Sequence, residues 1–344
     1  MMEILEIPDI NREVEKLVRQ VPEGKVSTYS AIARALGDVR AARAVAAVVG
    51  NLSPGCNPHR ILYADGGVPR NIGNIGSTQS DVRDLLRREG IDINNGIVPS
   101  LESRLFEDFR TTFPLKTLRR RQKLLARKIR LVSCRDVKSV AGLDVAYRGE
   151  IGVGAAAVFD MESGKMTGAE YASAKVSFPY IPTYLFYREF PVIEKIAGRL
   201  DEGTVLLLDG NGILHPFGIG VASQAGVELD RITVGAAKSL LCGKLRKVPE
   251  KPGAHSPIYL GKKMSGHCLK PGPGREKLYI SPGNKITVRE SLNIVAALCK
   301  GGREHPLLAA HKMARAKAIG KTVEKRQIYV TDVKARSRTL PGCR

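Results

Sequence analysis

The sequence predicts an α/β protein in which a mixed sheet with flanking helices follows a small, mainly helical domain. Two patterns lead to this fold class. In the second part of the chain, three consecutive strand-like segments are followed by strands that alternate with helices, which is typical of a layered α/β sheet. In the first part, two short helices are joined by a turn that contains glycine, which is the pattern of a helix-turn-helix. The length of 344 residues fits two domains at roughly 150 residues each.

The charge changes between the same two parts. Residues 1–110 contain 14 Lys/Arg and 15 Asp/Glu, whereas residues 111–344 contain 41 and 19, so the net charge of +21 belongs to the second part. A strongly basic domain indicates a polyanionic partner, usually nucleic acid. A composition of 43% hydrophobic and 26% charged residues excludes a wholly disordered or collagen-like chain.

The small domain begins with a helix over residues 8–20, where apolar side chains recur at helical spacing. Residues Ser27–Ser30 supply capping hydroxyls for a second helix, Ala31–Leu36, and Gly37 ends it. Further helices are predicted over residues 38–49 and 79–90, on either side of a glycine-rich loop at residues 64–76.

A helical bridge is predicted over Leu101–Arg130, and its Lys116–Arg130 segment carries eight Lys/Arg and no acid. Strands then follow, because apolar and β-branched residues cluster in short runs. The predicted strands are Val140–Tyr147, Ala155–Met161, Thr167–Val176, Thr204–Leu208, Ile232–Ala236, Ile258–Leu260 and Leu278–Ile280, and the predicted helices are Tyr184–Leu200, Gly218–Gly226, Val288–Leu298 and His305–Ile319.

Three acids stand where metal chemistry would need them. Asp144 lies inside an apolar strand, Asp209 ends another, and Glu189 lies in a helical segment. A carboxylate in a buried strand is costly unless it is paired or bound to a metal, and hard oxygen ligands suit Mg²⁺ or Mn²⁺. Such clusters hold metal ions against phosphodiesters. For Asp209, which precedes Gly210, a simple turn role is an equal alternative.

The second part of the chain resembles the endonuclease V family over roughly residues 115–320. The motifs that carry the resemblance are LRRRQKLLARKI, VAGLDVAY, SFPYIPTYLFYRE, LLLDGNGILHPFGIGVAS, ITVGAAK and LYISPGNKITV, in the order of the family. The resemblance implies a ribonuclease-H-like fold and a repair enzyme that nicks the second phosphodiester 3′ to deoxyinosine. The implied products carry 3′-hydroxyl and 5′-phosphate ends, and the implied cofactor is Mg²⁺, for which Mn²⁺ can substitute.

The resemblance also assigns roles to individual residues. It implies that Asp144, Glu189 and Asp209 bind metal together with His311, and that His215 and Lys238 support catalysis. It implies that the segment Pro179, Tyr180, Ile181 and Pro182 wedges into the gap left by an extruded base, and that Gly210, Gly212 and Gly220 line the pocket for that base. One departure is Gln224, where the family usually carries His.

The first part resembles the DNA-binding domain of O6-alkylguanine-DNA alkyltransferases over roughly residues 8–93. The motifs are VPEGKVSTYSAIARALG, RAVAAVVGN, NPHRIL and QSDVRDLLRREGI. The family's acceptor cysteine is replaced by Pro58, and proline cannot accept an alkyl group. The better match is to alkyltransferase-like proteins, which bind alkylated guanine without repairing it. This match implies lesion binding by Tyr29, Arg43, Asn51, Pro58, His59 and Arg60.

Four regions are therefore expected: a DNA-binding domain at 1–103, a linker at 104–114, a nuclease domain at 115–320 and a basic tail at 321–344. The expected partner is damaged DNA that contains inosine or alkylguanine. The six cysteines form no CxxC pair, which argues against a structural zinc site. No signal peptide or membrane-spanning run is visible, so a cytoplasmic monomer without a membrane partner is expected.

Three alternatives stay open from the sequence. Cys56, two residues before Pro58, could make the first domain an active alkyltransferase. The nuclease could act on inosine in RNA, because no motif reports contacts to the 2′-hydroxyl. The chain could also be a nucleic-acid-binding protein that keeps the fold without catalysis.

Overall fold

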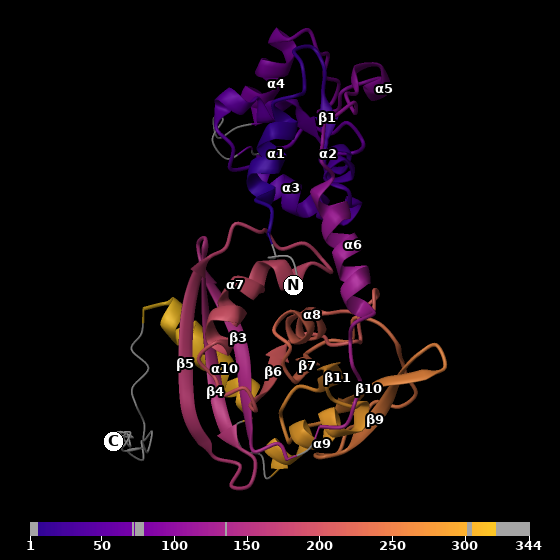
Figure 1. Cartoon of the computed structure of the whole chain (residues 1–344). Helices are drawn as coiled ribbons and strands as arrows, with labels where there is room; N and C mark the ends of the chain where they lie inside the picture. The colour runs from indigo at the N-terminus through magenta and orange to yellow at the C-terminus, as the bar shows by residue number, and fades with distance from the viewer. Residues whose placement is uncertain (1–5, 71, 73–78, 135, 301–304, 321–344) are drawn as a thin grey trace, which may run out of the picture.

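The computed structural model describes residues 6–70, 72, 79–134, 136–300 and 305–320. The predicted basic tail, 321–344, lies outside these residues. A mainly helical unit at the N-terminus sits above one end of a large sheet, and helix α6 runs between the two (Figure 1). Within the described residues, no helix has the length and apolar character needed to cross a membrane.

The first unit is built from short capped helices. The side chain of Asp9 accepts a hydrogen bond from the first turn of α1, and the Thr28 hydroxyl does the same for α2. Gly37 ends α2 in the left-handed conformation, with φ of 105°, which glycine adopts without steric cost. The elements are α1 (Ile10–Val18), β1 (Ser27–Thr28), α2 (Tyr29–Leu36), a 3₁₀ turn (Val39–Ala41), α3 (Ala42–Val49), β2 (Ile61–Leu62), α4 (Gln79–Arg88) and α5 (Leu101–Arg104).

The bridge predicted as helical over Leu101–Arg130 is interrupted. After α5 the chain is irregular until α6 (Pro114–Ala126) begins. Phe113, just before α6, has a φ of 51°, which is incompatible with a continuing right-handed helix. Pro114 then starts α6 at the position where a missing N–H costs nothing.

The sheet has nine strands in the order β5-β4-β3-β6-β7-β11-β10-β9-β8. Strands β3, β4 and β5 form an antiparallel meander. Strand β6 pairs in parallel with β3, and β7 pairs in parallel with β6. This core is the mixed sheet expected of a ribonuclease-H-like domain. Strands β8 and β10 have no counterpart in the sequence prediction. The strands are β3 (Ser139–Arg148), β4 (Ile151–Asp160), β5 (Met166–Lys175), β6 (Val205–Asp209), β7 (Thr233–Ala237), β8 (Lys244–Leu245), β9 (His255–Leu260), β10 (Lys263–Leu269) and β11 (Leu278–Asn284).

Helices cover both faces of the sheet (Figure 1). Alternate residues of β6 pack into different cores, Leu206 and Leu208 on one face and Val205 and Leu207 on the other, which explains why the strand is apolar throughout. The first face is covered by α7 and α8, and the second by α9 and α10. The helices are α7 (Leu185–Ala197), α8 (Val221–Glu228), α9 (Val288–Leu298) and α10 (Pro306–Ala318).

One apolar cluster joins the two units. It runs from Leu36 in α2 through Leu115 and Leu118 in α6 to Phe178 and Tyr184 beside α7, and all five side chains are buried. The predicted linker is also attached to the first unit, because the Thr111 hydroxyl donates to the carbonyl of Ala35. The backbone N–H groups of Phe106 and Arg110 also donate to the first unit, to the Val26 carbonyl and to Oε1 of Gln20, so residues 104–114 are attached to it at several points.

Candidate active site and metal centre

The sheet register brings Asp144 and Asp209 together. Strands β3 and β6 are parallel, with Leu143 opposite Leu208, so the next residue of each strand is an aspartate on the same face. That face is covered by α10. Gly142 allows α10 to pack closely against β3, because a Cβ at this position would lie 2.3 Å from the carbonyl carbon of Pro306 at the start of α10.

The third member of the cluster comes from α10. Nδ1 of His311 lies 2.7 Å from Oδ2 of Asp144. One ligand atom from each of Asp144, Asp209 and His311 can be chosen so that all three lie within 4.8 Å of one another. Lys238, which follows β7, places Nζ 2.7 Å from Oδ2 of Asp209.

Glu189, on α7, adds a third carboxyl group to the site. Its pKa is raised to about 8 by burial and by the charges of Asp144 and Asp209. The Tyr147 hydroxyl donates to its Oε1 at 3.3 Å. The pKa of Asp144 is also raised, by burial and by Asp209, although His311 and Lys238 act in the opposite direction. Like charges this close need a cation to be ionised together, so the donor set fits a divalent metal ion.

A cavity of about 300 Å³ opens beside this cluster. Its wall includes Asp209, Lys238 and His311, together with Arg275 and Glu276 from the segment before β11. The cavity therefore places a lysine and an arginine beside the candidate metal ligands, where an anionic group such as a phosphate would need them.

The segment predicted as a wedge forms a loop before α7. The Tyr180 side chain is 62% exposed, whereas Ile181 beneath it is fully buried. A second cavity, of about 190 Å³, lies beside this loop, and its wall includes Tyr180, Pro182, Gly210 and Gly220. Gly212 does not line this cavity. A Cβ at Gly212 would lie 2.1 Å from the carbonyl oxygen of Pro282 in β11, so this glycine serves packing.

His215 lies in the wall of the second cavity and not in the metal cluster. Its Nδ1 accepts a hydrogen bond from the backbone N–H of Phe217 at 3.3 Å. Burial, assisted by the positive charges of Arg119 and Arg40, lowers the pKa of His215 to about 4. At neutral pH the ring is therefore uncharged, with its proton on Nε2.

The first unit has an ordered set of polar contacts around Pro58. Nε2 of His59 lies 2.7 Å from Oε1 of Glu89, and the Arg60 guanidinium also binds Glu89. Pro58 is buried in the 3₁₀ turn that carries both. The Cys56 thiol is buried and points to Oε1 of Glu15 on α1, at 3.6 Å.

The other predicted lesion-binding residues of this unit differ in exposure. The Tyr29 side chain is 9% exposed and packs edge-on against Tyr63, with 5.5 Å between the ring centroids. The Arg43 side chain, on α3, is exposed, and the Asn51 side chain donates to the carbonyl of Ala47 at 2.8 Å. Arg43 and Asn51 are thus exposed, whereas Tyr29 is buried.

Comparison with known proteins identifies both units. The family model described as Endonuclease V matches residues 123–312, more than half of the chain.

The chain belongs to the endonuclease V family.

The model described as 6-O-methylguanine DNA methyltransferase, DNA binding domain, matches residues 9–91. Two relatives named bifunctional methyltransferase/endonuclease span nearly the whole chain. The protein from Picrophilus torridus is 31% identical, covering 88% of this chain and 95% of the relative, and that from Thermoplasma volcanium is 34% identical, covering 89% and 90%. The crystal structure of the Bacillus subtilis Endonuclease V is 26% identical with a TM-score of 0.55, covering 62% of this chain and 94% of that one.

These comparisons confirm the predicted resemblance and fold class. The chain is a DNA repair endonuclease of the endonuclease V family fused to an alkyltransferase-like DNA-binding domain. Sequence reasoning missed Tyr147 and Arg188 of the nuclease. The Arg188 guanidinium lies 4.1 Å from the centre of the Tyr147 ring and donates to the carbonyl of Phe178, which links the Glu189 helix to the wedge loop. The sequence did offer a signal for Arg188, because it directly precedes Glu189 in the FYRE motif.

Proposed function

We propose that this endonuclease V nicks DNA at the second phosphodiester 3′ to deoxyinosine and leaves 3′-hydroxyl and 5′-phosphate ends. The observation that carries the proposal is the cluster of Asp144, Asp209 and His311, with Glu189 beside it and an exposed tyrosine on the neighbouring loop. A metal centre next to a wedge suits an enzyme that cuts the backbone near an extruded base.

Each residue has a proposed part in the reaction. Asp144, Glu189, Asp209 and His311 would hold Mg²⁺, with Mn²⁺ as a substitute, and the bound cation would supply Lewis acidity and a water of lowered pKa. Lys238 would bind the scissile phosphate, because its ammonium lies beside Asp209, which is one of the proposed metal ligands.

The base would be extruded into the second cavity. Tyr180 would stack in the vacated space, and a flat ring can offset part of the unstacking cost. Neutral His215 would donate from Nε2 to a group in that cavity. Gly210 and Gly220 would offer backbone close to the base. We place the nuclease domain at residues 115–320 and propose that it acts as a monomer.

The test is cleavage of matched DNA and RNA duplexes, each with a single inosine and an end label, with products mapped to the nucleotide. Nicking of the DNA at the second 3′ phosphodiester in Mg²⁺, lost in Asp209→Ala, is the expected result. A wild-type rate in Asp209→Ala would remove the metal assignment. Cleavage of RNA alone would replace the DNA proposal with an inosine-specific ribonuclease.

We further propose that the first domain, residues 1–103, binds alkylated guanine without accepting the alkyl group. The support is Pro58 at the nucleophile position beside an intact His59–Glu89 pair, with Arg43 exposed for contact. Binding to a duplex with one O6-methylguanine should exceed binding to an undamaged duplex, and Arg43→Ala should reduce that difference. Equal binding to both duplexes would overturn this proposal.

A further inference from the structure

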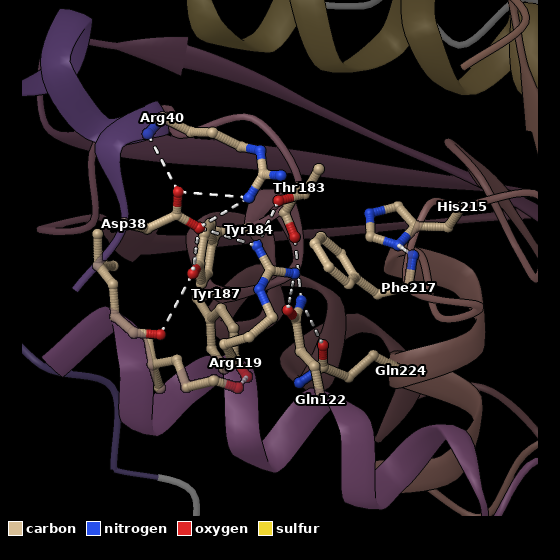
Figure 2. A network of polar contacts seen from close by, with 12 residues as sticks. Asp38, Arg40, Arg119, Gln122, Thr183, Tyr184, Tyr187, His215, Phe217 and Gln224 are labelled. Carbon is tan, nitrogen blue, oxygen red and sulfur yellow. Dashed lines mark hydrogen bonds and ion pairs between the residues drawn. The ribbon is translucent and has the colours of Figure 1, made fainter. Parts of the chain in front are cut away.

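An aspartate of the first domain reaches the nuclease through a network of polar contacts (Figure 2). Asp38 follows the glycine that ends α2, and its Oδ1 accepts from the backbone N–H of Arg40 at 3.0 Å. Its Oδ2 accepts from the Tyr184 hydroxyl at 2.8 Å and from Nη2 of Arg119 at 3.3 Å. The Asp38 side chain is 9% exposed. We call Asp38, Arg119, Gln122, Thr183 and Tyr184 the Asp38 network.

Arg119, on α6, is the centre of the Asp38 network. Its guanidinium lies between two rings, 4.2 Å from the centre of Tyr184 and 3.6 Å from the centre of Phe217. The same group donates to the Thr183 hydroxyl and to Oε1 of Gln122, each at 2.6 Å. A planar guanidinium with fixed donors can hold several partners at once in one geometry.

The far end of the Asp38 network is the wedge loop. Thr183, directly after Pro182, has a φ of 72°, a left-handed conformation that is strained for a β-branched residue. Its hydroxyl is held by Arg119, and its carbonyl accepts from Nε2 of Gln122 at 3.0 Å. Such a conformation persists only where the surroundings impose it. The α6 side chains therefore fix one end of the loop that carries Tyr180.

The Asp38 network also borders the second cavity, because Gln122 and Thr183 belong to its wall together with Tyr180 and His215. The first domain packs tightly against α6, since a Cβ at Gly37 would lie 2.7 Å from the backbone nitrogen of Lys116. A change at Asp38 would thus act on the wall of the cavity through a tightly packed contact.

Holding the two domains together does not require the Asp38 network, because the apolar cluster through Leu115 and Leu118 already joins them. A partly buried ion pair adds little net stability, since desolvation offsets much of its attraction. What such a pair supplies is a defined orientation. We propose that Asp38 is a positioning residue of the nuclease, which acts through Arg119 to hold the Pro179–Thr183 loop ready for the extruded base.

This inference rests on the proposed inosine-specific function, so its test uses two separate readouts on the full chain. The variants are Asp38→Asn, which keeps the shape and removes the charge, and Arg119→Lys, which keeps the charge and removes the planar fork. The control is Glu107→Gln, because Glu107 pairs with the exposed Arg34 of the first domain and has no contact with the Asp38 network among the described residues.

The first readout is amide hydrogen exchange without substrate. Asp38→Asn should raise exchange selectively over residues 181–187, and Glu107→Gln should not. The second is single-turnover nicking of an inosine duplex with 2-aminopurine next to the lesion. Asp38→Asn should lower both the nicking rate and the fluorescence that reports base extrusion, by about tenfold for the rate, with affinity for undamaged duplex unchanged. The Asp38→Asn, Arg119→Lys double variant should be no slower than the slower single variant.

Unchanged exchange over residues 181–187, or a rise spread evenly over the whole chain, would overturn the positioning role whatever the substrate. Raised local exchange with a wild-type nicking rate would overturn the link to base capture. If the wild-type protein nicks no inosine substrate, the proposed function fails, and the exchange measurement still decides whether Asp38 holds the loop.

Discussion

The substitution Glu189→Gln should stabilise the metal-free protein while it abolishes nicking. Glu189 has a pKa of about 8 in the folded protein, against an ordinary value of 4.5, because it is buried near Asp144 and Asp209. Glutamine preserves the shape and the acceptor for the Tyr147 hydroxyl, and it carries no titrating group. The variant therefore isolates the cost of placing a third carboxylate in the site.

The sign of the pH dependence follows from the two pKa values. Between pH 4.5 and 8 the unfolded chain loses the Glu189 proton and the folded chain keeps it, so the wild-type stability falls as the pH rises through this range. The stability of the Glu189→Gln variant does not fall in this way, because glutamine does not titrate. Its gain in unfolding free energy has a ceiling of about 1 kcal/mol at pH 5 and roughly 4 kcal/mol at pH 7.5.

The assay is equilibrium unfolding in urea, followed by circular dichroism, with EDTA at both pH values. The gain should grow between pH 5 and pH 7.5, and Mg²⁺ should shrink it at pH 7.5 because a bound cation relieves the repulsion in the wild-type site. A gain that is equal at both pH values, or a variant less stable than wild type at pH 7.5, would refute the reasoning.

Three further predictions concern single residues. Lys238→Ala should reduce single-turnover nicking by about 100-fold, because preorganised cations near a phosphate contribute on this scale; a rate within twofold of wild type would exclude a role for this lysine. Tyr180→Ala should weaken binding to an inosine duplex more than binding to undamaged duplex, by about 1–3 kcal/mol for one stacked ring, and equal losses would exclude the wedge. The wild-type protein should take up no label from DNA that contains methyl-labelled O6-methylguanine. Label on the protein that Cys56→Ala removes would instead establish an active transferase.

Short-range features of the fold could be predicted from the sequence. Helix α2 begins at the predicted capping hydroxyl and ends at Gly37, because capping depends on residues three or four positions apart. The pairing of Asp144 with Asp209 was also foreseeable, since both carboxylates sit on apolar strands and few sheet topologies suit such strands.

Long-range contacts were beyond the sequence pattern. The contact of Asp38 with Tyr184 joins residues 146 positions apart, and no local periodicity reports such a separation. Gly212 shows a second limit of prediction from the sequence. A glycine beside a ligand pocket and a glycine beneath another strand look the same in a sequence, and only the position of Pro282 distinguishes them. The interruption of the bridge covers residues 105–113 and ends at Phe113, whose φ is 51°, and the helical spacing of apolar residues did not reveal it.

The shared apolar cluster bears on how this fusion can be taken apart. A nuclease fragment that begins at residue 115 would expose Leu115, Leu118 and the surface around Tyr184, all of which are buried in the intact chain. Exposed apolar surface of this kind promotes aggregation. A transplant of the first domain onto another enzyme would therefore need α6 as part of the graft. For the same reason, a substitution at one site can abolish the function of one domain and leave the shared cluster intact, whereas deletion of a whole domain would expose that cluster.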